Sequence, residues 1–385
     1  MYGMVACNKK RKVALNMDLK KIEENICKSG FKLEHEISST LREEGWTLIT
    51  NKYYLDDNEE SVREIDILAY KCKFISKISI FTAIIISCKK SESNNWALLS
   101  RDIIKNDPNV DWQPFKGYTN NIGISFFLEK KEWSKEYYDR MLKTCPGIFK
   151  KPEVDIFAFQ EMSKEKSTCQ NDKNIFNSIT SLMKAQAYEL NSLKSNRIKD
   201  DQVFYQFNLI SVIDSELIRI KFEEKNIQAS IIDSDDYISN YILNKKTSTS
   251  RIKFLTAKKF KETITEYTTL HSENALLIKQ LDSFFFKDIL LSREKSKLLI
   301  PKFREALKKY LWSPYYSVTQ DTLNIENFDV AWDSRNKEAI IEIDASRKIV
   351  SELNDDDACI KAAKKVLEEV YRYNGRAYFE EAIIF

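Results

Sequence analysis

The sequence predicts an α/β fold, in which helices flank a sheet, followed by a mainly helical α+β C-terminal region. Ile65, Ile67 and Ala69 alternate with Glu64, Asp66 and Leu68, as in a strand with one buried face. Residues 81–86 form an almost unbroken apolar run, which is typical of a strand buried on both faces. Residues 31–44 place apolar side chains at helical spacing, and Gly45 follows where a helix would end.

The remaining elements are expected from the same patterns, taken in chain order. An N-terminal helix is expected at residues 18–29. Strands are expected at 46–54, 63–67, 84–90, 122–128 and 154–159, and helices at 96–105, 133–143 and 175–193. Residues 203–213 and 216–222 are expected to pair with each other, followed by a strand at 228–232 and a helix at 234–243. The C-terminal region should contain helices at 257–267, 272–286, 301–312 and 356–373, a hairpin of 328–332 with 339–344, and a strand at 376–385.

A stretch rich in lysine, serine and threonine at residues 244–250 is the best candidate for a linker. It would divide the chain into a first domain at residues 18–243 and a second at residues 251–385. In the second domain, basic residues are interleaved with aromatic ones, as on surfaces that bind nucleic acid or a partner protein. Aromatic residues at helical spacing also form cores, so both interpretations stand.

Composition limits the classes of function. A chain of 385 residues with 43% hydrophobic residues can bury a substantial core, in one large domain or two ordinary ones. The net charge of +3 provides no strong overall field, so any binding to nucleic acid would depend on a local basic patch. No apolar run approaches the roughly 20 residues that cross a membrane, which predicts a cytoplasmic protein without membrane contact.

Cysteine and histidine usage narrows the chemistry further. The 7 cysteines include no Cys-x-x-Cys pair, which argues against a zinc site and a disulfide framework and fits a reducing compartment. The chain has only 2 histidines, His35 and His271. Two histidines offer few groups for a histidine-dependent nuclease or a Ser-His-Asp triad, so both kinds of site are disfavoured.

Asp66 lies in one predicted strand, and Ser87 and Lys89 end the next. Because strand side chains repeat every two residues, Ser87 and Lys89 share a face. A carboxylate and a lysine on neighbouring buried strands are costly unless they pair or serve a site. Mg²⁺ binds one or two carboxylates with phosphate oxygens and water, and a lysine beside it can orient the attacking water. The alternative interpretation is that no site exists, and that Asp66 is an aspartate tolerated at the surface and Lys89 a lysine at the edge of the sheet.

The segments GFKLEHEISSTLREEGW, REIDILAY and IIISCKKSESNNW resemble the restriction-endonuclease-like, or PD-(D/E)xK, nuclease superfamily. They are similar to bacterial Mrr-like restriction and phage-defence nucleases. The resemblance covers residues 31–96. It implies a core with a mixed sheet, in which a helix, three strands, a helix and a further strand follow one another along the chain. It also implies that Glu36, Asp66 and Lys89 are the helix glutamate, the strand aspartate and the lysine of the family's site.

The sequence departs from the family pattern at Ser87, where the family usually has a glutamate or aspartate. Some branches with Ser-x-Lys recruit a carboxylate from the following helix, a role that Asp102 could fill. Glu36 could also suffice together with Asp66. A third interpretation is a degenerate site that binds nucleic acid without cutting it.

The resemblance implies a DNA endonuclease of bacterial restriction or antiviral defence that depends on Mg²⁺ or Mn²⁺. Glu36, Asp66 and the carbonyl of Cys88 would hold the metal, Lys89 would position water, and Ser87 would donate a hydrogen bond to water or phosphate. Homodimers are common among such enzymes. The alternatives are an inactive subunit that binds DNA or a defence-system partner protein, and a nuclease that acts on RNA.

Overall fold

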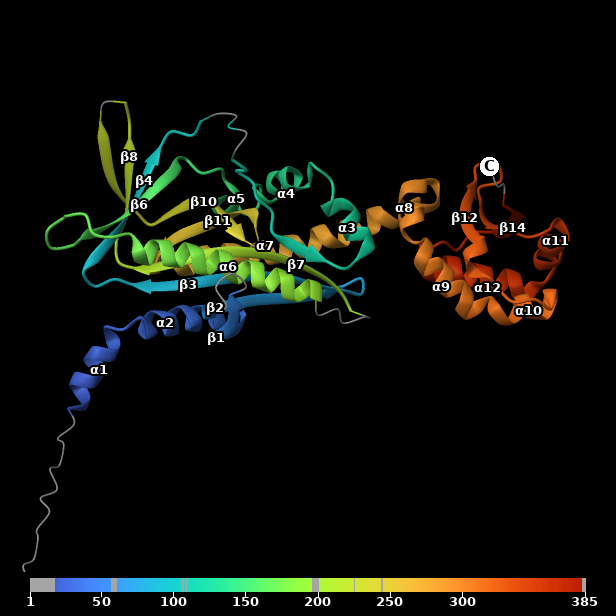
Figure 1. The fold of residues 1–385 in the computed structure, drawn as a ribbon, viewed down its shortest axis with the longest axis horizontal. Helices are drawn as coiled ribbons and strands as arrows, with labels where there is room; N and C mark the ends of the chain where they lie inside the picture. The colour runs from blue at the N-terminus through green and yellow to red at the C-terminus, as the bar shows by residue number, and fades with distance from the viewer. Residues whose placement is uncertain are drawn as a thin grey trace, which may run out of the picture.

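The computed structural model describes residues 18–56, 61–104, 107, 110–195, 201–224, 226–243 and 245–382. Figure 1 shows a large α/β body and a smaller C-terminal unit at one end of an elongated molecule. The N-terminal helices α1 (Leu19–Cys27) and α2 (Gly30–Glu43) lead into the body from below, and α1 buries none of its residues.

The body is built on a mixed sheet, so the expectation of an α/β fold with a mixed sheet is confirmed at that level. Its strands lie in the order β1-β2-β3-β7-β11-β10, and the short β5 (Gly117–Thr119) also pairs with β7. They are β1 (Thr47–Asp56), β2 (Ser61–Ile75), β3 (Ile78–Lys90), β7 (Gln202–Asp214), β11 (Lys246–Thr256) and β10 (Ser234–Leu243). β1, β2 and β3 form an antiparallel meander, whereas β7 runs parallel to both β3 and β11.

Helices cover both faces of this sheet. The long helix α6 (Lys173–Ser195) packs on one face, where its Ile179 and Leu182 share a core with Ile85 of β3. Helices α2 and α7 (Phe260–Phe286) pack on the other face, in a second core that contains Leu33 and Ile84. The alternation of inward residues along β3 supplies both cores, as expected of a strand buried on two sides.

A second sheet stands beside the first and has the order β6-β4-β8-β9. Its strands are β4 (Asn94–Arg101), β6 (Asp155–Ser163), β8 (Leu217–Phe222) and β9 (Ile227–Ile232). Three short helices, α3 (Ile122–Leu128), α4 (Trp133–Met141) and α5 (Pro146–Phe149), lie between β5 and β6 in the sequence.

The C-terminal unit has its own core and a three-stranded sheet in the order β12-β13-β14. Its strands are β12 (Phe328–Asp333), β13 (Glu338–Ile343) and β14 (Ala377–Glu381). Its helices are α8 (Arg293–Leu298), α9 (Ile300–Tyr310), α10 (Trp312–Thr319), α11 (Arg347–Asp355) and α12 (Asp357–Tyr371). The predicted hairpin of β12 with β13 and the predicted helix before β14 are confirmed.

Three predicted elements have the wrong type. Residues 94–101 form a strand instead of a helix, because Trp96 and its neighbours are buried between β6 and β8. Residues 122–128 form a helix instead of a strand, and the side chain of Asn121 accepts a hydrogen bond from the N–H of Ile124 at 2.9 Å to cap it. Residues 234–243 form a strand, since Asp235 and Asp236 pair with cations of neighbouring strands instead of capping a helix.

The predicted pairing and linker are also wrong. Residues 202–214 and 217–222 are strands, but they belong to different sheets. Residues 246–250 of the expected linker begin β11, which pairs with β10 and β7 inside the main sheet, while Asn244 lies outside the described residues. The two helices expected at 257–267 and 272–286 form the single helix α7.

Candidate functional site

The candidate site lies where β2 and β3 separate. Their last paired residues are Ile67 and Ile86, and both strands continue beyond that point. There the carboxylate of Asp66 accepts a hydrogen bond from the backbone N–H of Cys88 at 2.8 Å. The same oxygen, Oδ2, accepts from Ser87 Oγ and from Lys89 Nζ, each at 3.3 Å. The structure therefore brings together Asp66, Ser87 and Lys89, the strand residues selected from the sequence.

Strand β7 fixes the position of this group from the other side. It pairs with β3 without interruption up to Lys90, which places Ser87 beside Ser211. The hydroxyl of Ser211 is hydrogen-bonded to that of Ser178 in α6 at 2.7 Å. Ser87 is buried, while the side chains of Asp66 and Lys89 remain 20% and 31% exposed. A ligand can therefore reach the carboxylate and the ammonium group from solvent.

Glu34 of α2 is a half-buried helix carboxylate that interacts electrostatically with Asp66. Burial and the charge of Asp66 raise the pKa of Glu34, while the charge of Lys89 acts in the opposite direction. A carboxylate in the field of another negative charge favours a nearby cation or a proton. Glu34 was not selected from the sequence. Its signal there is its position beside the apolar stripe of Leu33, Ile37 and Leu41, whereas Glu36 lies further from that stripe around the helix axis.

The structure does not bring Glu36 to this group. Its side chain is 58% exposed and pairs with Lys32 at 3.7 Å, one turn earlier in the helix. Side chains that are two residues apart on a helix point in nearly opposite directions, so Glu34 and Glu36 cannot both face the sheet. The apolar residues that face the sheet, Leu33 and Ile37, flank Glu34 instead.

Asp102 lies apart from this group, whereas the backbone N–H of Cys88 donates to Asp66. The role of the Cys88 carbonyl as a metal ligand stays a prediction. Asp102 follows β4, is exposed, and pairs with Lys221 of β8 at 2.9 Å. The thiol of Cys88 is buried in the core under α2, and burial raises its pKa well above the usual value. Among the residues that the structure describes, no three His, Cys, Asp or Glu side chains are grouped to hold a metal ion.

The donor set at the site is therefore two carboxylates, Glu34 and Asp66. That set suits Mg²⁺, which takes one or two protein carboxylates and completes its shell with water and phosphate oxygens. It does not suit a closed structural zinc site, which needs four protein ligands.

An open cleft of about 330 Å³ extends from Asp66 and Lys89 to α6. Its other lining residues are Val62, Arg63, Glu64, Asn177, Thr180, Ser181 and Lys184. The sequence suggested Lys184 either as a phosphate contact or as a solvated lysine. Instead, Lys184 is buried and pairs with the buried Asp56 at 2.6 Å, and Arg63 also pairs with Asp56, at 3.3 Å. This ion cluster fixes α6 against the end of β1 at the wall of the cleft.

Comparisons of the chain with protein-family models, with curated protein sequences and with solved structures gave no match. Within the described parts of the chain, no helix combines the length and the apolar character needed to cross a membrane. The function must therefore be inferred from the site itself.

Proposed function

We propose that the chain is a Mg²⁺-dependent endonuclease that hydrolyses DNA phosphodiester bonds, in bacterial restriction or antiviral defence. The observation that carries the proposal is the convergence of Asp66 and Lys89 at the separation of β2 and β3, with Glu34 interacting electrostatically with Asp66. Elements α2, β1, β2, β3, α6 and β7 also follow the order helix, three strands, helix, strand that the family resemblance implies. Residues 91–172 would then be an insertion in that core.

Each side chain would have a distinct role. Glu34 and Asp66 would hold the metal ion, which when bound supplies charge stabilisation at the scissile phosphate. Lys89 Nζ would hold the attacking water and offset negative charge on the phosphate oxygens. Ser87 Oγ, buried against Asp66, would keep that carboxylate oriented. Glu34 would take the role that the resemblance gave to Glu36. It would also supply a second carboxylate to the site, where position 87 is a serine.

Cleavage of supercoiled plasmid by the purified chain tests the proposal, in Mg²⁺ and in Mn²⁺. Wild type should nick or linearise the plasmid, and Lys89→Ala and Asp66→Asn should lose that activity. Equal cleavage by wild type and both variants would refute the assignment, because it would point to a contaminating nuclease. Matched assays on single-stranded DNA and on RNA identify the substrate class.

A pair of substitutions on one helix separates Glu34 from Glu36. Glu34→Gln should reduce the cleavage rate by about 100-fold or more, because one of two metal ligands is lost. Glu36→Gln removes the same charge two residues away and should stay within about twofold of wild type, since its side chain faces solvent. The reverse result would show that Glu36 is the functional residue.

The second candidate is an inactive nuclease-fold subunit that binds DNA or a partner protein. It is favoured by the serine at position 87 and by the three hydrogen bonds that already occupy one oxygen of Asp66. Calorimetric titration with Mn²⁺ distinguishes the two candidates. An active site should bind the ion with an affinity that falls in Asp66→Asn, whereas an inactive subunit should show no binding that depends on Asp66.

A further inference from the structure

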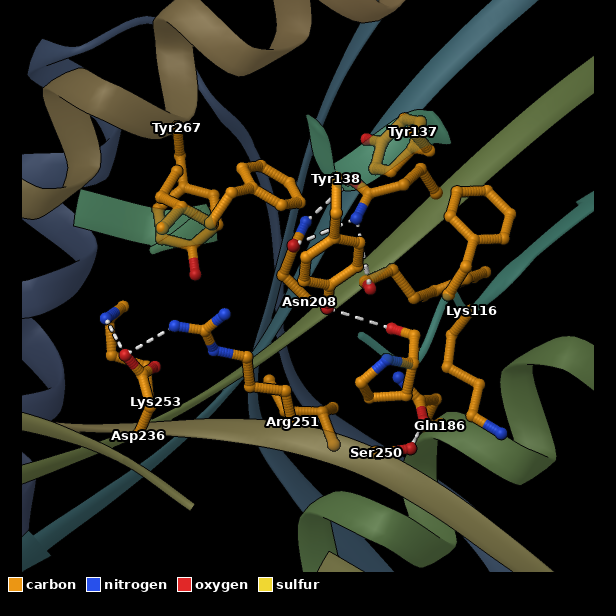
Figure 2. A pocket seen from close by; sticks show the side chains of 17 residues that line it. Lys116, Tyr137, Tyr138, Gln186, Asn208, Asp236, Ser250, Arg251, Lys253 and Tyr267 are labelled. Carbon is orange, nitrogen blue, oxygen red and sulfur yellow. Dashed lines mark hydrogen bonds and ion pairs between the residues drawn. The ribbon is translucent and has the colours of Figure 1, made fainter. Parts of the chain in front are cut away.

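A small polar cavity lies in the main sheet away from Asp66, where β7 and β11 separate. The first pair of their parallel ladder is Leu209 with Ile252, and earlier residues of the two strands are not paired with each other. Figure 2 shows the cavity, with Arg251 and Lys253 of β11, Asp236 of β10 and Tyr267 of α7 around it. These residues come from separate parts of the sequence, and the proposed nuclease chemistry uses none of them.

At this cavity two buried positive charges share one negative charge. Arg251 Nη2 and Lys253 Nζ both contact the same oxygen of Asp236, Oδ2, at 2.7 and 2.9 Å. The two basic side chains are only 9% and 7% exposed. Asp235, the other carboxylate at this end of β10, pairs with Arg219. One buried positive charge is therefore left without a counter-charge, which is costly unless an anion joins it.

Several buried polar atoms at the cavity also lack partners. Arg251 Nη2 donates to Asp236 and to the carbonyl of Lys150 at 2.6 Å, but Nε and Nη1 of the same guanidinium have no hydrogen-bond partner. Oδ1 of Asp236 has none either. The cavity thus presents two unused donors and one unused acceptor. Figure 2 shows the hydroxyl of Tyr267 pointing toward the same guanidinium.

Size and hydrogen bonding together select the ligand. The cavity volume is about 30 Å³, roughly twice what one water molecule needs, so a compact group fits and a sugar or a base does not. Chloride and sulfate could accept from Arg251 but have no proton to donate to Asp236. Hydrogen phosphate has oxygens that accept and an O–H that donates. We propose that this cavity binds one hydrogen phosphate group, from inorganic phosphate or from the terminal phosphate of a larger molecule.

Calorimetric titration of the full chain with inorganic phosphate, at pH 7 and constant ionic strength, tests the proposal. We expect one phosphate per chain, with an affinity at least tenfold higher than for sulfate. Arg251→Gln should weaken phosphate binding at least tenfold. Because loss of a buried arginine can prevent folding, Lys116→Met provides a second test. Lys116 lines the cavity from its rim, where its Nζ donates to Ser248 at 3.1 Å, and its loss should weaken binding severalfold.

Two control variants locate the site. Lys150→Gln removes an exposed lysine just outside the cavity and should leave phosphate binding unchanged. Lys89→Ala should also leave it unchanged, and this control separates the cavity from the cleft at Asp66. The proposal is overturned if phosphate does not bind saturably, if Lys116→Met binds as well as wild type, or if only Lys89→Ala abolishes binding. In the first case water fills the cavity.

A competition experiment distinguishes the two sources of phosphate. A 5′-phosphorylated oligodeoxynucleotide should displace inorganic phosphate, and its 5′-hydroxyl counterpart should not, if a terminal phosphate group enters the cavity. If neither oligonucleotide competes while inorganic phosphate still binds, the ligand is the free ion. Either result supports phosphate binding in the cavity, and the two results differ only in the source of the phosphate group.

Discussion

Replacing His271 with glutamine should remove part of the acid sensitivity of the fold. His271 lies in α7, is buried against β3, and has its Nδ1 3.1 Å from Thr82 Oγ1. Burial, together with the charges of Lys71 and Lys73, lowers the pKa of His271 from its ordinary 6.5 to about 4. Below pH 6.5 the unfolded chain therefore binds a proton at this position that the folded chain does not. The free energy of unfolding then falls as the pH falls from 6.5 toward 4, and is fully recovered above 6.5.

The size of the effect follows from the two pKa values. Each pKa unit corresponds to about 1.4 kcal/mol, so this histidine can account for at most about 3.4 kcal/mol. Between pH 7.5 and pH 4.5 the expected loss is about 2.5 kcal/mol. Urea unfolding of wild type and His271→Gln over this range, followed by tryptophan fluorescence, measures it. Carboxylates titrate in both proteins, so the difference between the two curves isolates the histidine.

His35 provides the matched control, because it is exposed on α2. His35→Gln should show the same dependence of unfolding free energy on pH as wild type. If the curves of wild type and His271→Gln are parallel between pH 4.5 and 7.5, the reasoning is refuted. That result would mean that the imidazole takes up its proton in the folded chain.

Three further predictions concern packing and reactivity. Lys184→Met removes the 2.6 Å ion pair with the buried carboxylate of Asp56 and should lower the free energy of unfolding by about 3 kcal/mol, measured by chemical denaturation. Trp96→Ala should cost about 3–5 kcal/mol in the same assay, because the indole is fully buried between strands. A thiol reagent followed by mass spectrometry should modify the exposed Cys72 in the folded chain, but should reach Cys88 only after unfolding; early modification of Cys88 would contradict its burial.

Strands β1, β2, β3 and β7 of the first sheet could be predicted from local pattern, whereas β10 and β11 of the same sheet could not. Residues 81–86 are apolar on both faces and are covered by helices on both faces. Short runs such as residues 94–101 and 122–128 fit either a strand or a helix, and tertiary partners decide between them. The strand at 234–243 could not be predicted, because Asp235 and Asp236 resemble helix-capping residues until their buried cations are known.

The same distinction applies to the site. Asp66, Ser87 and Lys89 could be selected because they lie on two strands whose side-chain period is simple. The helix glutamate depends on a rotation about the helix axis, and one hundred degrees per residue is enough to exchange a buried position for an exposed one. The cavity around Arg251 has no local signal, since positions 116, 236, 251 and 267 come from a loop, two strands and a helix that meet only in the folded chain.

Because the chain is synthesised from its N-terminus, the late position of α7 in the sequence affects how the chain folds on the ribosome. β3 is complete at residue 90, but its sheet neighbour β7 and the helix α7 that packs on it end at residues 214 and 286. Until those residues have left the ribosome, the face of β3 that carries Ile84 and Ile86 is covered by α2 but not by α7. A nascent chain of intermediate length therefore exposes apolar strand surface of the kind that chaperones bind and that aggregates. A gene fragment that stops at residue 243 would make this transient state permanent.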